Sequence, residues 1–130
     1  MANPFIADTS ILINFFRGVP ETRYLTSAYE EGQIFIPTIV RYELLCGVKE
    51  QKHREQRKQF LAECQMLDLT PEIADLAGEL YSDLRDRGRT IDNEDIIIAA
   101  TAVVHDLPVA TLNVRHFEGI NKLRLFTNLN

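Results

Sequence analysis

The sequence is poor in the side chains that bind zinc or form disulfides. It has two cysteines among 130 residues, Cys46 and Cys64, and neither belongs to a Cys-x-x-Cys motif. Its three histidines show no His-x-x-x-His spacing. The sequence therefore argues against a tetrahedral zinc site, and isolated cysteines of this kind are most often inert core thiols.

Long hydrophobic runs are also missing. No apolar stretch approaches the ~20 residues needed to span a bilayer, and no basic segment followed by an apolar one opens the chain. We therefore expect a cytoplasmic protein that does not bind membranes. The hydrophobic content of 45% and the charged content of 25% are ordinary for a globular fold, and the length permits a single domain over residues 1–130.

Basic residues are outnumbered by acidic ones. The chain has 14 Lys and Arg against 19 Asp and Glu, which gives a net charge of −5. This balance argues against a protein that holds nucleic acid mainly through bulk positive charge. The acidic residues therefore need an explanation of their own.

Short apolar strands alternate with helical segments along the chain. The pattern predicts strands at 3–7, 34–36, 66–69, 108–111 and 123–126. It predicts helices over 10–17, 21–31, 38–48, 49–61, 71–88 and 92–105. Strands separated by helices indicate the α/β class, with a parallel sheet covered on both faces. Ligands of such sheets bind outside the carboxyl ends of the strands.

Acidic residues occupy several of the positions where such a ligand would bind. Asp8 directly follows the first predicted strand and fits either a helix N-cap or a carboxylate aimed into the crevice at the sheet edge. Glu43 lies on or beside the apolar stripe of the helix over 38–48. Burying its charge is costly unless the carboxylate pairs with an arginine, reaches water at the rim or binds a metal.

A second acidic group opens the helix over 92–105. Asp92 and Asp95 are three residues apart and share one helical face, and Glu94 lies between them. Locally they fit an N-cap and first-turn charges that offset the helix dipole. Because the rest of this helix is strongly apolar, we expect it to be buried, with its acidic start close to Asp8 at the end of the sheet.

Taken together, these acids are expected to face one edge of the sheet. Their like charges would repel one another, and a divalent cation would relieve that repulsion. Carboxylate oxygens without Cys or His ligands select Mg²⁺ or Mn²⁺, and acid clusters that hold one or two such ions are the usual apparatus for cleaving phosphodiesters. Thr111 and Asn113, at the end of the strand over 108–111, fit either a local turn or hydrogen bonds to carboxylates or metal-bound water.

Four fragments, in this order and at these intervals, carry a resemblance that covers essentially the whole chain. They are Phe5-Ile6-Ala7-Asp8-Thr9-Ser10-Ile11-Leu12-Ile13, Val40-Arg41-Tyr42-Glu43-Leu44, Asp92-x-x-Asp95-Ile96-x-Ile98-Ala99-Ala100-Thr101-Ala102 and Leu107-Pro108-Val109-Ala110-Thr111-Leu112-Asn113-x-x-His116-Phe117. In them the chain resembles the PIN-domain family, and within it the VapC-like toxins of bacterial and archaeal toxin–antitoxin pairs. The resemblance implies a three-layer α/β/α sandwich around a parallel sheet of about five strands.

The resemblance also implies a metal-dependent endoribonuclease that leaves a 5′-phosphate and a 3′-hydroxyl. The positions that match the family's metal-binding acids are Asp8, Glu43 and Asp95. Further metal-site or water-positioning groups match at Asp92 and Asn113, although some relatives carry Asp where this chain has Asn113. Hydroxyl groups that hydrogen-bond the acids match at Thr9, Ser10 and Thr111. One or two Mg²⁺ or Mn²⁺ ions are implied as cofactors.

For VapC-like proteins the resemblance implies an RNA substrate, a cognate antitoxin and a homodimer. Apolar residues of the first helices fit either core packing or such an interface: Phe15, Phe16, Tyr24, Leu25, Tyr29 and Tyr42. The segment 49–59 carries five Lys or Arg against two Glu. It fits a solvated helix face or an RNA docking strip through Lys52, Arg54, Arg57 and Lys58. Arginines before the helix over 92–105 fit phosphate contacts or plain surface: Arg85, Arg87 and Arg89.

Two other classes of function compete with a nuclease. A catalytically silent PIN-like module would bind only RNA or a partner, but this chain retains all three acids. A Mg²⁺-binding phosphoacceptor module would need an acid pair after the first strand, an aspartate after the third and a lysine after a late strand. This chain has only Asp8, Thr70-Pro71 and Asn113 at those places.

Overall fold

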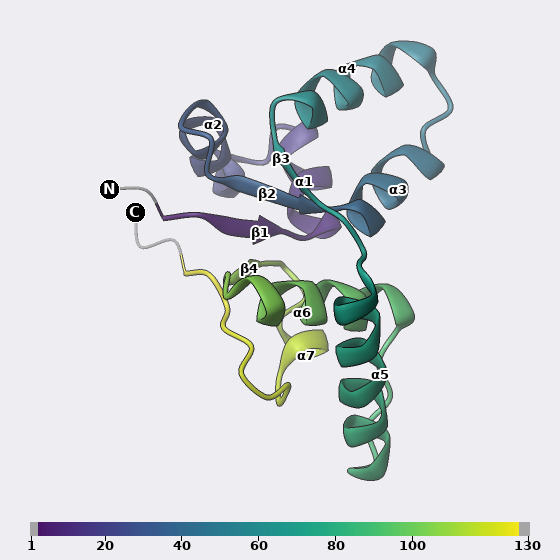
Figure 1. Cartoon of the computed structure of the whole chain (residues 1–130). Helices are drawn as coiled ribbons and strands as arrows, with labels where there is room; N and C mark the ends of the chain where they lie inside the picture. Colours follow the sequence, from purple (N-terminus) through teal and green to yellow (C-terminus); the bar gives the residue numbers. More distant parts are fainter. Residues whose placement is uncertain (1–2, 128–130) are drawn as a thin grey trace.

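The fold is known from a computed structural model, which describes residues 3–127. Figure 1 shows a small sheet with helices on both sides. The strands are β1 (Phe5–Ala7), β2 (Ile34–Pro37), β3 (Gln65–Leu67) and β4 (Val109–Ala110). The helices are α1 (Thr9–Phe16), the 3₁₀ helix η1 (Pro20–Thr22), α2 (Tyr24–Glu30), α3 (Thr38–Cys46), α4 (Gln51–Ala62), α5 (Pro71–Asp86), α6 (Asn93–His105) and α7 (Val114–Phe117).

The sheet has the strand order β3-β2-β1-β4, and every neighbouring pair is parallel. In the centre, β1 pairs with β2 through Phe5 and Ile34 and with β4 through Ile6 and Val109. All three residues of β1 are buried, as expected for a strand that is covered on both faces. Since parallel strands end at the same edge, the residues that follow β1 and β4 lie next to each other.

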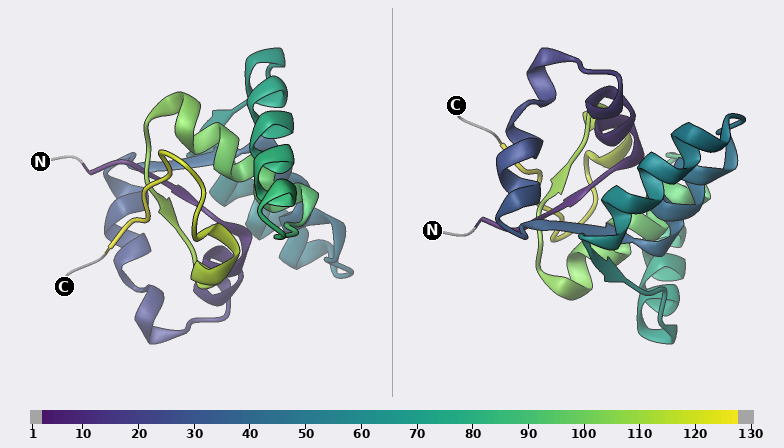
Figure 2. Two further views of the ribbon diagram at one scale, coloured as in Figure 1. Left: turned by 90° about the horizontal axis from the view of Figure 1, so that it is seen from below. Right: turned by 90° about the horizontal axis from the view of Figure 1, so that it is seen from above.

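The helices form two layers, and the predicted three-layer α/β/α class is confirmed. Figure 1 shows α1, α2 and α4 above the sheet and α5, α6 and α7 below it, and Figure 2 gives the views from below and from above. The apolar helix α6 is buried as its sequence predicts, and it packs most extensively against α5. Helix α3 contacts both α1 and α6, so it links the two layers at the carboxyl edge of the sheet.

The prediction of about five strands is wrong by one. The segment 123–126 runs beside β4 but forms only a single bridge, between Val109 and Leu125. Two hydrogen bonds hold it there, from the Val109 N–H to the Arg124 carbonyl and from the Phe126 N–H to the Val109 carbonyl. Because β4 is two residues long, it offers too few backbone groups for a longer ladder.

Two further elements differ from the predicted pattern. The helix predicted over 21–31 is divided at Arg23 into η1 and α2, because the chain after Pro20 first makes one tight turn that the Thr22 hydroxyl fixes on the Val19 carbonyl at 2.7 Å. The short helix α7 follows β4 where only a turn was predicted. Within residues 3–127, no helix combines the length and the apolar character that a membrane crossing requires.

Candidate active site

Asp8 lies at the carboxyl end of β1 and is 3% exposed. Its Oδ1 accepts a hydrogen bond from the backbone N–H of Thr9 at 2.7 Å, so Asp8 does cap α1. Its Oδ2 accepts hydrogen bonds from the hydroxyls of Ser10 at 3.1 Å and Thr111 at 2.6 Å. Thr111 reaches Asp8 because it follows β4, the parallel neighbour of β1. Asp8 therefore caps α1 with one carboxylate oxygen and contacts the end of β4, at the carboxyl edge of the sheet, with the other.

Glu43 is half-buried on α3 and faces the start of α1. Its Oε1 accepts a hydrogen bond from the Thr9 hydroxyl at 2.7 Å. The ion pairs formed within the described chain do not include Glu43, so the arginine pairing that its sequence position allowed is absent there. Burial raises the pKa of Glu43 above its ordinary value, the Thr9 hydroxyl opposes this rise, and the charges of Asp8, Glu94 and Asp95 add to it.

Asp95 lies in the first turn of α6, and its side chain is 15% exposed. The Nδ1 atom of His116, on α7, lies 2.9 Å from its Oδ2. Burial raises the pKa of Asp95, the hydrogen bond and charge of His116 lower it, and the charges of Asp8 and Asp92 raise it. Asp8 thus lies near enough to Glu43 and Asp95 for its charge to raise both pKa values, and Thr9 bridges Asp8 and Glu43 by hydrogen bonds.

The two remaining predicted site residues lie beside this group and are exposed. Asp92 is the N-cap residue of α6, although its side chain makes no capping hydrogen bond. Asn113 precedes α7, and its backbone N–H donates to the Thr111 hydroxyl at 2.9 Å. The Ser10 hydroxyl accepts a hydrogen bond from the Leu112 backbone N–H at 3.1 Å, which ties the loop after β4 to the start of α1. The predicted hydroxyl positions therefore join Asp8, Glu43 and the Asn113 loop in one network.

The donor set fits a hard divalent cation. Across residues 3–127, no three His, Cys, Asp or Glu side chains already stand in a group that would enclose a metal ion. The hydrogen bonds of the described residues nevertheless leave Glu43 Oε2 and Asp95 Oδ1 without a donor. Mutually repelling carboxylate oxygens of this kind are ligands that Mg²⁺ and Mn²⁺ prefer. Binding would require these side chains to close around the ion.

Sequence reasoning missed His116. The sequence presents it as one of three histidines without zinc-site spacing and as part of the fragment that ends at Phe117, with no role assigned, and its contact with Asp95 spans 21 positions. The signal available was its position three residues after Asn113, in the turn that follows the last strand of the sheet. That position puts it at the carboxyl edge, where the acids were already expected.

The predicted RNA-docking strip on α4 divides into two kinds of residue. Arg54 donates hydrogen bonds to the carbonyls of Leu45 at 3.1 Å and Val48 at 2.7 Å, and Arg57 donates to the carbonyl of Leu44 at 2.6 Å. These carbonyls end α3 or follow it directly. Lys52 and Lys58 are exposed. The two arginines therefore have a structural task, whereas the two lysines face solvent.

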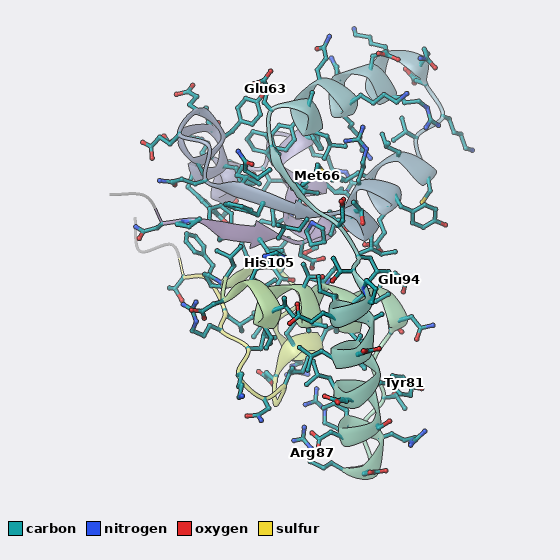
Figure 3. All side chains as sticks on the ribbon, in the orientation of Figure 1. Glu63, Met66, Tyr81, Arg87, Glu94 and His105 are labelled. Carbon is teal, nitrogen blue, oxygen red and sulfur yellow. The ribbon has the colours of Figure 1, made fainter. Side chains whose placement is uncertain are left out.

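Arg85 lies in the last turn of α5, whereas Arg87 and Arg89 follow that helix and contact the segment around α7. Arg87, labelled at the far end of α5 in Figure 3, donates to Asp83 Oδ2 and to the Gly119 carbonyl, both at 2.8 Å. Arg89 donates to the carbonyls of Glu118 and Arg115. Arg85 is exposed and makes a long ion pair with Asp86, at 3.9 Å. Contacts of these arginines with phosphate remain a prediction.

Most of the candidate interface residues pack against the core with part of their surface exposed. Phe15, Phe16 and Tyr29 surround the ring of Phe60 on α4, with ring centroids 4.7–5.6 Å from it. Tyr24 stacks on Phe126 at 6.1 Å, and Leu25 is fully buried. Tyr42 differs from them, because 61% of it is exposed directly before Glu43 in the sequence. Core packing thus accounts for Leu25. The other five residues keep part of their surface exposed, most of all Tyr42, and their place in an interface stays a prediction.

Comparison with known proteins adds a family to this geometry. The profile of the PIN domain matches residues 5–123. Ribonuclease VapC19 of Mycobacterium tuberculosis is 37% identical over 114 residues, which cover 86% of this chain and 90% of the relative. Ribonuclease VapC10 of the same organism is 36% identical over 120 residues, which cover 92% of this chain and 90% of the relative.

Solved structures agree with this relationship. One is a chain of VapBC2 from Rickettsia felis, in a crystal structure with a DNA fragment from the VapBC2 promoter. It is 27% identical to this chain with a TM-score of 0.78, and the match covers 94% of this chain and 96% of that chain. A chain of the DNA-bound VapBC from Salmonella typhimurium has a TM-score of 0.81 and covers 97% of this chain and 98% of that chain. At 24% identity, the second likeness shows the fold alone.

Proposed function

The chain belongs to the PIN domain family, and from this premise we propose that it is a metal-dependent endoribonuclease, the toxin of a toxin–antitoxin pair. The observation that carries the proposal is the convergence of Asp8, Glu43 and Asp95 from β1, α3 and α6. Glu43 and Asp95 both have raised pKa values, caused first by burial and then by nearby acidic charges, Asp8 among them in both cases. Relatives of similar length that are named ribonucleases support the reaction class.

The three carboxylates would hold Mg²⁺ or Mn²⁺ through oxygens that the protein keeps oriented. Thr9 holds Oε1 of Glu43 and leaves Oε2 available, while its backbone N–H holds Oδ1 of Asp8. Ser10 and Thr111 fix the other oxygen of Asp8. When bound, the ion would lower the pKa of a coordinated water and offset negative charge on the phosphate.

Asp92 and Asn113 are exposed beside the acids, and we assign to them the orientation of water or of a phosphate oxygen. In-line attack by water on the scissile phosphate would not need the ribose 2′-hydroxyl. Membership of the family implies that the 3′-oxygen is the leaving group, so cleavage would leave a 5′-phosphate and a 3′-hydroxyl. End-labelling of the products with and without phosphatase tests this outcome.

An acidic protein also needs a local basic surface to receive RNA. Lys52 and Lys58 supply exposed positive charge on α4, which packs against α3, the helix of Glu43. We assign the cytoplasm as the place of action, and a cognate antitoxin and a second copy of this chain as its protein partners. The neighbouring reading frame, co-purification and sedimentation in solution test these assignments.

The central experiment is cleavage of total RNA by the purified protein. We expect cleavage with Mg²⁺ or Mn²⁺, loss of cleavage with EDTA, and recovery when the ion is restored in excess. Asp8→Asn and Asp95→Asn should each abolish it, because each removes a charge that holds the ion and leaves the side-chain volume unchanged.

Asp75→Asn, on the exposed side of α5, is the matched control and should cleave like the unmodified protein. If either site variant retains full, EDTA-sensitive cleavage, the assignment of that acid is wrong. If the unmodified protein binds RNA and never cleaves it, the chain is instead a silent binding module.

A further inference from the structure

His116 makes the only ion pair that the described residues direct at one of the three acids. Its Nδ1 lies 2.9 Å from Oδ2 of Asp95, whose side chain is 15% exposed, whereas 49% of the histidine side chain is exposed. The two residues come from different helices, α7 and α6. Their contact is therefore a product of the tertiary fold and not of helical spacing.

The backbone around His116 is held in place without help from this ion pair. The next residue, Phe117, is 2% exposed and anchors α7 in the core. Arg89 donates to the carbonyls of Arg115 and Glu118, which lie on either side of His116 in the sequence, and Arg87 donates to the Gly119 carbonyl at 2.8 Å. The position of His116 next to Asp95 is therefore fixed before any ion binds.

The backbone conformation accounts for a glycine at position 119. Gly119 has φ +77°, a conformation that L side chains rarely adopt, and a Cβ there would lie 2.5 Å from Nη1 of Arg89. The chain therefore turns sharply after α7 under the arginine side chains. This turn keeps α7, and with it His116, close to the start of α6.

The pairing leaves Asp95 with one oxygen engaged and one free. His116 contacts Oδ2 of Asp95, and the Thr9 hydroxyl donates to Oε1 of Glu43. Asp95 and Glu43 therefore each keep one oxygen without a donor among the described residues. Carboxylates that bind metals are in turn hydrogen-bonded, and loss of such a partner typically costs about 10–100-fold in metal affinity or activity. A purely structural ion pair is a weaker explanation, because Phe117 and the two arginines already anchor α7.

We propose that His116 is a positioning residue, which holds Oδ2 of Asp95 through Nδ1 so that Oδ1 is presented to the divalent ion. This inference rests on the proposed function. It adds a residue that acts on the ion through Asp95 and does not itself contact the ion or the RNA.

The test is Mn²⁺ affinity, measured by electron paramagnetic resonance of the free ion in the absence of RNA. His116→Ala should weaken Mn²⁺ binding by about 10-fold or more. His116→Asn should restore affinity to within about threefold, because the asparagine amide N–H₂ stands close to the place of Nδ1 in the ring. The same ranking is expected for RNA cleavage at limiting Mn²⁺.

His105 supplies the matched control, since it lies on the same helix as Asp95 but at the opposite end. Figure 3 shows this separation through the labels of His105 and Glu94, the residue next to Asp95. His105→Ala should bind Mn²⁺ like the unmodified protein. Thermal unfolding of each variant shows that it is folded, and His116→Asn provides the comparison if His116→Ala is not.

The outcomes separate the inference from the function beneath it. If the unmodified protein and His116→Ala bind Mn²⁺ equally, or if His116→Asn binds as weakly as His116→Ala, positioning through Nδ1 is overturned while the nuclease assignment stands. If the unmodified protein neither binds Mn²⁺ nor cleaves RNA, the proposed function fails, and this inference fails with it.

Discussion

Glu43 combines partial burial with acidic neighbours, and both raise its pKa. Its folded-state pKa is therefore higher than its unfolded-state pKa, and the folded chain binds more protons at pH values between the two. Under these conditions the free energy of unfolding falls as pH rises through that interval. Without a metal ion, the buried charge of Glu43 thus makes the fold less stable at neutral pH than it is when Glu43 is protonated.

We therefore expect Glu43→Gln to stabilise the metal-free protein at pH 7. The gain should be about 1 kcal/mol or less, because the carboxylate is partly solvated and its repulsion is screened. The gain should shrink as pH is lowered toward the ordinary pKa of glutamate, where Glu43 itself becomes neutral. Urea unfolding in EDTA between pH 5 and 8 measures it.

Glu79→Gln, on the exposed side of α5, should show no comparable gain. A Glu43→Gln protein that is no more stable than the parent at pH 7 would contradict the pKa shift. The same variant should lose RNA cleavage, so the substitution is expected to separate stability from activity.

For single residues, the position of a carboxylate can be predicted from the sequence when a buried strand or a buried helix fixes it. Asp8 could be placed because it follows a buried apolar run, and Asp95 because it opens a buried helix. His116 could not be placed, since its partner is set by the path of the chain from β4 into α7. The hydrogen bond between Thr9 and Glu43 likewise spans 34 positions and depends on how α3 packs on α1. Local pattern carries no information about such pairs.

At the scale of elements, α4 stabilises the end of α3. The last carbonyls of a helix lack partners within it, and Arg54 and Arg57 donate to the carbonyls of Leu44, Leu45 and Val48. Arg57 also lies over the ring of Phe16, 5.3 Å from its centroid. The basic segment is therefore more than a solvated face, and its arginines and lysines should respond differently to mutation.

We predict that exchanging Lys52 and Lys58 together for Glu weakens RNA binding and leaves stability nearly unchanged. Arg57→Met should instead destabilise the fold by about 1.5–3 kcal/mol, the range for hydrogen bonds to charged groups. RNA affinity is measured by fluorescence anisotropy in an Asp8→Asn background, and stability by urea unfolding. The lysine exchange should also lower the salt dependence of binding, because fewer phosphate contacts release counterions.

If the protein with both lysines exchanged binds RNA as tightly as its parent at low salt, α4 is not part of the RNA-binding surface. The matched control is Lys122→Glu, an exposed lysine in the segment after α7, far along the chain from α4. Its exchange should change neither RNA affinity nor stability appreciably.

Element boundaries were predictable where a local signal exists. The helix predicted over 71–88 is α5, Pro71–Asp86, because Thr70 caps it through the Ile73 N–H at 3.2 Å and proline occupies its first position. The division at Arg23 has no comparable signal in the sequence. Similarly, the segment 123–126 has the apolar character of a strand, but pairing needs a partner of matching length and β4 is too short.

At the scale of the molecule, the net charge of −5 has a structural location. Asp8, Glu43 and Asp95 are three of its 19 acidic residues, and they are gathered at the edge of the sheet without a Lys or Arg ion pair among the described residues. A divalent ion would neutralise two of these three charges at the place where a phosphate must approach. An acidic composition is therefore compatible with an RNA substrate.

The whole fold should accordingly be stabilised by Mn²⁺. An ion that binds only the folded chain stabilises it by about 2.7 kcal/mol when its free concentration is about 100 times its dissociation constant. For a domain of this size, that corresponds to a rise of roughly 10 °C in Tm. Differential scanning fluorimetry in EDTA and in Mn²⁺ measures the rise, which should vanish in Asp8→Asn and persist in Asp75→Asn. An equal rise in Asp8→Asn would mean that the stabilising ion binds elsewhere, because the repulsion it relieves at this edge requires the buried charge of Asp8.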